Sequence, residues 1–238
     1  MPRVSLLHLS SNNFEGSISK DIGNARNLSN LQIDCNRFSG KLPSEIAKVG
    51  LLSVFNASNN KFSGSIPDAL YGLHNLDVLG LQVNLLSGNI SSSIGSLKQL
   101  TELNLKGNDI SGEIPMQMGD LQNLIYLDLS KNQLKGKVPA SLANLTFSFL
   151  NLSNNQLSGK VPSSLSKFKE AFIGNPKLCG EDFQDIKPCV LEKEDHHLMT
   201  WILCGILVSA VAMVLVVGLG CFYKKYYQSP LVKDKENL

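Results

Sequence analysis

The chain has 238 residues, a formal net charge of +2 and 43% hydrophobic residues, and this length allows one or two domains. The near-neutral charge argues against nucleic-acid binding, which requires a basic face. A protein kinase catalytic domain needs about 250 residues of its own, and the sequence contains no G-x-G-x-x-G, H-R-D or D-F-G motif. Five scattered cysteines are too few for a small scaffold held together by disulfides.

An asparagine recurs every 24 residues up to residue 132, and a seventh follows after 23 residues. A glycine lies four residues after each asparagine. Apolar residues lie five and three residues before each asparagine, and two and six residues after it. Because one such unit cannot bury its own apolar face, the period predicts a solenoid of stacked coils. The repeated asparagines are Asn12, Asn36, Asn60, Asn84, Asn108, Asn132 and Asn155.

Each unit also predicts its own local structure. The x-L-x-L alternation predicts a short strand with one buried face. We expect the asparagine to bond backbone groups of the turn that follows it, and the glycine to permit that turn. A proline then stiffens the next segment, with Ser19 and Ser91 replacing it in two units. These consensus residues are therefore interpreted as scaffold.

The unit reads L-x-x-L-x-L-x-x-N-x-L/F-S-G-x-I-P-x-x-L/I-G-x-L-x-x and resembles the plant-specific form of the leucine-rich repeat. The resemblance covers residues 1 to about 166, which we interpret as seven repeats. It implies an α/β solenoid with short parallel strands and a mostly irregular or 3-10 convex side. Residues 167–190 are then expected to form a C-terminal cap.

The outward-facing strand positions, which lie six, four and two residues before each asparagine, form the expected concave face. They mix polar and apolar residues without a cluster of His, Cys and carboxylate side chains, so we expect no catalytic, cofactor or metal site. Their apolar members indicate either contact with an extended peptide or protein, or ordinary exposed variation. The candidate contact residues are Val54, Val78, Glu102, Lys106, Tyr126, Asp128 and Phe149.

The period fails after Pro162, and the string Phe172-Ile-Gly-Asn-Pro-Lys-Leu-Cys-Gly follows. This string looks like the C-terminal cap of plant leucine-rich repeat receptors. That resemblance implies a Cys179–Cys189 disulfide and an oxidising compartment, with two free thiols as the alternative. Cys35 has no evident partner, and we interpret it as a packed thiol.

Five N-x-S/T sequons indicate N-glycosylation. The repeat consensus itself contains strings such as N-L-S, however, and these create sequons without selection for a glycan. Two of them, at Asn56 and Asn151, fall on the concave face. The acceptor asparagines are Asn27, Asn56, Asn89, Asn144 and Asn151.

A linker at 191–197 precedes an uncharged apolar run at 198–222, which is long enough to span a bilayer as a single helix. Lys224 and Lys225 follow it directly, and the positive-inside rule therefore predicts extracellular repeats and a cytoplasmic tail at 223–238. This topology predicts a single-pass plasma-membrane protein. The alternative is a buried helix of a soluble protein.

Several strings narrow the resemblance to the HAESA-like and related peptide-hormone receptor kinases of plants. Members carry a signal peptide, about twenty repeats, one membrane helix and a serine/threonine kinase. The resemblance implies a secreted peptide ligand on the concave face and a co-receptor kinase docking around residues 100–189. The strings are Ala25-Arg-Asn-Leu-Ser-Asn-Leu, Asn36-Arg-Phe-Ser-Gly, Leu150-Asn-Leu-Ser-Asn-Asn and Phe172-Ile-Gly-Asn-Pro.

The sequence departs from that family in three respects. It contains no Arg-x-Arg pair, which reads the peptide C-terminus in several members, and it lacks both the N-terminal half and the kinase. The first hypothesis is therefore a truncated, kinase-less receptor fragment that acts through protein contacts and is not an enzyme. The alternatives are a partial gene model of a full receptor kinase, or a receptor-like protein that naturally lacks a kinase.

Overall fold

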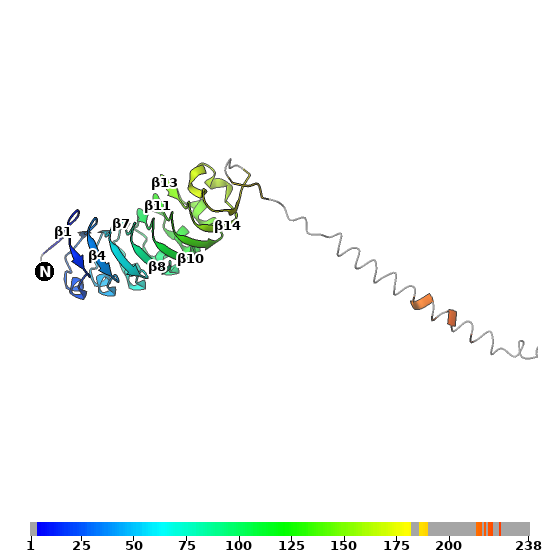
Figure 1. Cartoon of the computed structure of the whole chain (residues 1–238), viewed down its shortest axis with the longest axis horizontal. Helices are drawn as coiled ribbons and strands as arrows, with labels where there is room; N and C mark the ends of the chain where they lie inside the picture. Colours follow the sequence, from blue (N-terminus) through cyan, green and yellow to red (C-terminus); the bar gives the residue numbers. More distant parts are fainter. Residues whose placement is uncertain are drawn as a thin grey trace, which may run out of the picture. The chain divides into compact units, whose positions relative to one another are not determined.

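The computed structural model describes residues 4–181, 186–189, 213–215, 217, 219–220 and 224. The chain divides into two compact units, Met1–Cys189 and Val190–Leu238. The first unit is a solenoid in which successive coils follow one another in chain order from β1 to β14 (Figure 1). The prediction of a leucine-rich repeat solenoid is confirmed.

One parallel sheet carries the predicted short strands. Neighbouring strands pair in constant register, so that Leu7 lies opposite Leu31 and Leu31 lies opposite Phe55. The central residue of each strand points into the core, and the two flanking residues point outward, as the alternation predicts. The strands are β1 (Leu6–His8), β3 (Asn30–Gln32), β5 (Val54–Asn56), β7 (Val78–Gly80), β9 (Glu102–Asn104), β11 (Tyr126–Asp128) and β13 (Phe149–Asn151).

A second parallel sheet is a correction to the expected fold, because we predicted a turn where its strands lie. The residues before the consensus glycine are extended and pair with the next coil, and the glycine itself adopts a left-handed conformation, as at Gly40 (φ 77°). The strands are β2 (Glu15–Gly16), β4 (Arg37–Gly40), β6 (Lys61–Gly64), β8 (Leu85–Asn89), β10 (Asp109–Glu113), β12 (Gln133–Gly136), β14 (Gln156–Lys160) and β15 (Lys177–Cys179).

The helical segments described in the first unit are all 3-10 helices. Of the expected α/β class, the described part of this unit therefore shows the strands and no α-helix. Proline precedes most of them, as expected. Where serine replaces proline, the hydroxyl caps the helix: Ser19 accepts from the Asp21 N–H, and Ser91 from the Ser93 N–H. The helices are η1 (Lys20–Asn24), η2 (Ser44–Lys48), η3 (Asp68–Gly72), η4 (Ser92–Ser96), η5 (Met116–Asp120), η6 (Ala140–Asn144), η7 (Ser163–Leu165) and η8 (Lys169–Phe172).

The repeated asparagines connect consecutive coils through hydrogen bonds. The side-chain amide of Asn60 donates to the carbonyl of Ala57 (3.2 Å) in its own coil and to that of Ile33 (2.9 Å) in the preceding coil. Its carbonyl oxygen accepts from the Phe38 N–H (2.9 Å). The prediction that asparagine bonds the turn that follows is therefore wrong, because the bonds run back to the preceding turn and coil.

The cap continues this ladder in a way that the sequence period did not predict. Asn175, which lies outside the period, accepts from the Leu157 N–H (3.0 Å) and donates to the Leu152 carbonyl (3.1 Å). A Cys179–Cys189 disulfide closes the loop beyond it. Phe172 is fully buried and belongs to the same hydrophobic core as the apolar residues of the last coil. Cys35, by contrast, is an exposed free thiol, so its interpretation as a packed residue is wrong.

The expected membrane span at 198–222 falls largely outside the described residues. Met213–Leu215, Val217, Leu219 and Gly220 are described there, and all are helical. Among the residues that the structure describes, no helix is both long and apolar enough to cross a membrane. The linker at 191–197 and the tail at 223–238, apart from Lys224, also lie outside the described residues.

Candidate partner-binding face

The candidate face consists of the outward-facing residues on the strands of the first sheet. In the row nearest the start of each strand, Val54 lies beside Val78, and Tyr126 lies beside Phe149. Glu102 pairs in register with both Val78 and Tyr126, so it divides the predicted apolar stripe into two patches. The face therefore offers one aliphatic patch and one aromatic patch with a carboxylate between them.

The aromatic patch is the more exposed of the two. The rings of Tyr126 and Phe149 stack with their centroids 4.5 Å apart and their planes 11° from parallel, and Phe149 remains 38% exposed. Partial burial and the carboxylates of Asp128 and Glu102 raise the pKa of the Tyr126 hydroxyl. This hydroxyl therefore stays protonated at neutral pH and can donate a hydrogen bond.

Some polar side chains of the face form hydrogen bonds within the fold, where we predicted that they would be free to contact a partner. Asp128 is only 2% exposed, and its carboxylate accepts from the N–H (2.9 Å) and the hydroxyl (2.6 Å) of Ser130. The structure therefore removes Asp128 from the candidate contact residues. Glu102 and Lys106 are half-buried and remain at the surface.

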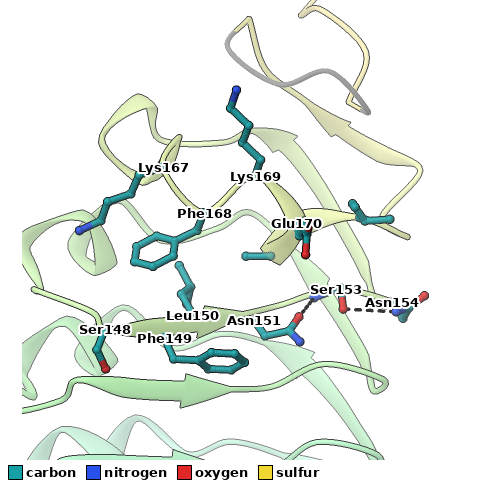
Figure 2. Close-up of a pocket in the computed structure, with 12 residues that line it drawn as sticks. Ser148, Phe149, Leu150, Asn151, Ser153, Asn154, Lys167, Phe168, Lys169 and Glu170 are labelled. Carbon is teal, nitrogen blue, oxygen red and sulfur yellow. Dashed lines mark hydrogen bonds between the residues drawn. The ribbon is translucent and has the colours of Figure 1, made fainter.

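A cavity of about 600 Å³ adjoins the aromatic patch, and sequence reasoning missed it. Figure 2 shows Phe149 and Asn151 on one wall, with Phe168 and Glu170 facing them across the gap. The ammonium of Lys167 lies 4.8 Å from the centre of the Phe168 ring. The only signal in the sequence was an aromatic residue between two lysines just after the period fails.

The candidate glycosylation sites fall into two groups. Asn27, Asn89 and Asn144 are exposed. Asn56 and Asn151 are half-buried on β5 and β13, and their side-chain oxygens accept from the N–H groups two residues later, at 3.2 and 3.0 Å. Glycans on these last two would compete with the hydrogen bonds of the concave face.

The chemistry of the described residues is that of a contact surface. Within the described part of the chain, no group of three or more His, Cys, Asp and Glu side chains could hold a metal ion. The outward rows instead combine aromatic, aliphatic, amide and charged side chains on a rigid parallel sheet. Such a surface is suited to binding an extended or protein partner.

Fold and face together define a repeat protein whose concave face exposes both apolar and polar side chains. The family model described as Leucine Rich Repeat matches residues 3–25, 27–49, 51–73, 99–121, 123–145 and 146–168, more than half of the chain. The chain belongs to the leucine-rich repeat family. No curated protein sequence matches it.

Solved structures of plant receptor ectodomains resemble the chain. The Arabidopsis receptor kinase HAESA, in complex with the peptide hormone IDA and the co-receptor SERK1, is 49% identical over 76% of this chain and 30% of its own, with a TM-score of 0.74. The ectodomain of the receptor kinase GASSHO1/SCHENGEN3 from Arabidopsis thaliana, in complex with CASPARIAN STRIP INTEGRITY FACTOR 2, is 38% identical over 79% of this chain and 23% of its own, with a TM-score of 0.76.

The plant peptide hormone receptor RGFR1, in complex with RGF2, is 35% identical over 76% of this chain and 28% of its own, with a TM-score of 0.68. The chain therefore spans less than a third of each of these three receptor chains. What they share with it is a leucine-rich repeat ectodomain structure.

Proposed function

We propose that the chain is a recognition segment of a plant cell-surface receptor of the HAESA-like type. It binds a secreted peptide or the ectodomain of a co-receptor kinase through the concave face, and it acts by binding and not by catalysis. In this proposal the repeats are extracellular, and the apolar run at 198–222 anchors them in the plasma membrane. Its role is peptide-hormone perception or co-receptor docking in transmembrane signalling.

The observation that carries the proposal is the exposed Tyr126–Phe149 stack on the concave sheet. Stacked aromatic rings offer a large contact area at low cost in side-chain entropy, and aromatic residues dominate binding energy at protein interfaces. The likeness to HAESA, whose solved complex holds both IDA and SERK1, supports a peptide or co-receptor as the partner.

The direct test is calorimetric titration of the full chain with the SERK1 ectodomain, in the presence and absence of the IDA peptide. We expect saturable binding, and we expect Tyr126→Ala to weaken it by roughly tenfold or more because an aromatic anchor is lost. Met116→Ala on η5 is the matched control, since Met116 is exposed but lies outside the concave rows. An absence of binding under both conditions would contradict the proposal.

A further inference from the structure

The two sheets of the solenoid end differently at the cap. The second sheet gains an additional strand there, because β15 pairs with β14. The concave sheet ends at β13, and the cap residues that would follow it form the helix η8 instead. The concave sheet is therefore one strand shorter than the second sheet.

The missing strand leaves backbone groups of β13 without partners among the residues that the structure describes. In the preceding coil, the carbonyl of Ile125 accepts from the N–H groups of Ser148 (2.8 Å) and Phe149 (3.1 Å). No described residue donates to the equivalent carbonyl of Ser148. By the alternation of a parallel ladder, the N–H and the C=O of Leu150 point to the same open edge.

The cap resumes the pairing only beyond the strand. Leu152 N–H donates to the Ala171 carbonyl (2.7 Å), and Asn154 N–H donates to the Ile173 carbonyl (2.8 Å). The open stretch therefore covers about three residues, Ser148 to Leu150, and it is bounded by the cap. An open edge of this kind is a template for an added strand.

The place of the missing strand is occupied by the cavity of about 600 Å³. The edge of β13 forms one wall of this cavity, and residues 167–171 of the cap form the other (Figure 2). One face of the Phe149 ring stacks on Tyr126, which leaves the other face toward the side where the next strand would lie. The cap wall includes Lys167, Lys169 and Glu170, and the Lys169 side chain points away from β13 (Figure 2).

We propose that this edge binds an extended segment of another polypeptide, which completes the concave sheet as an additional strand. Its backbone bonds the open groups of Ser148 and Leu150, and an aromatic side chain continues the stack on Phe149. A neighbouring carboxylate pairs with the ammonium of Lys167, which lies over the Phe168 ring at the cap wall. The proposal shares the Phe149 ring with the function proposed above, but it rests on the open backbone edge of β13 and on no particular receptor ligand.

The experiment selects ligands from a phage-displayed random heptapeptide library on the full chain. We expect enrichment of peptides with an aromatic residue beside an acidic one. Phe149→Ser should weaken their binding by roughly tenfold because the stack is lost, and Lys167→Glu should weaken it through charge repulsion. Leu6→Ser is the matched control, because Leu6 is exposed in the same row at the opposite end of the sheet.

Hydrogen exchange followed by mass spectrometry then locates the peptide. Binding should slow exchange of the Leu150 N–H, which faces the open edge, and leave the Leu127 N–H unchanged, because the β11 edge is already paired. The proposal is wrong if no peptide is enriched, or if enriched peptides bind Phe149→Ser with unchanged affinity. Slow exchange of the Leu150 N–H in the free chain would equally overturn it, since the edge would then be occupied by the chain itself.

Discussion

At the residue scale, the position directly before each repeated asparagine adopts a left-handed backbone. This conformation suits glycine and asparagine and is costly for a β-branched side chain. Val83 adopts it with φ 56°, and 49% of the side chain is exposed, so packing offsets little of the strain. The equivalent residues are Ser11, Cys35, Asn59, Val83, Gly107, Lys131 and Asn154.

We therefore expect Val83→Asn to stabilise the solenoid by about 1 kcal/mol, because asparagine tolerates the left-handed region. Thermal unfolding followed by circular dichroism should show a midpoint about 3 °C higher. The reverse change, Lys131→Val, places a β-branched side chain at φ 55° and should lower the midpoint by a similar amount. Equal midpoints for both variants would contradict the backbone explanation.

At the element scale, successive 3-10 helices approach so closely that some positions exclude a side chain. A Cβ added at Gly119 in η5 would overlap the Cβ of Ser141 in η6 and lie 2.8 Å from its carbonyl carbon. Neither of these atoms belongs to the mobile end of a side chain, so relief requires the coils to separate. At Gly72 in η3, an added Cβ would meet nothing within 4 Å.

Gly119→Ala should accordingly destabilise the chain by about 2 kcal/mol through overpacking. Gly72→Ala is the control in an equivalent type of helix, and it should be neutral or stabilising by up to about 1 kcal/mol because alanine restricts the unfolded chain. Urea unfolding with both variants distinguishes a steric cause from a general intolerance of alanine. Equal losses of stability in the two variants would refute the steric explanation.

The strands of the concave sheet could be predicted because leucine alternation directly reports which face is buried. The second sheet could not be predicted, because its strands contain the Ser-Gly sequence that is typical of a turn. These strands pair only once the coils stack. Asp128 was misplaced on the surface because its burial depends on the hydroxyl of Ser130. The cavity at β13 could not be predicted, since it depends on η8 turning the chain away from the sheet.

At the scale of the whole molecule, the proposed extracellular topology makes a prediction about glycans. In a chain expressed in plant cells, Asn27, Asn89 and Asn144 should carry N-glycans, because they are exposed. Glycopeptide mass spectrometry measures the occupancy at each site. Asn56 and Asn151 should show lower occupancy, since their side chains bond the folded backbone.

A triple variant with Asn27→Gln, Asn89→Gln and Asn144→Gln is the control, and it should lose most of the mass shift that glycosidase treatment removes from the unmodified chain. If the unmodified chain shows no glycan at any of these sites, then the repeats have not entered the secretory pathway. That outcome would reject the proposed location without affecting the fold.

The asparagine ladder has a consequence for how such a chain can change in length. Most ladder bonds between coils join residues 22 or 27 positions apart, and those of the 23-residue coil join residues 21 and 26 apart. Because the spacing is set by one coil and its immediate predecessor, a duplicated or excised coil recreates the same bonds at the new junction. Gene rearrangements in whole-coil steps can therefore lengthen or shorten the concave face while preserving the hydrogen bonding that supports it.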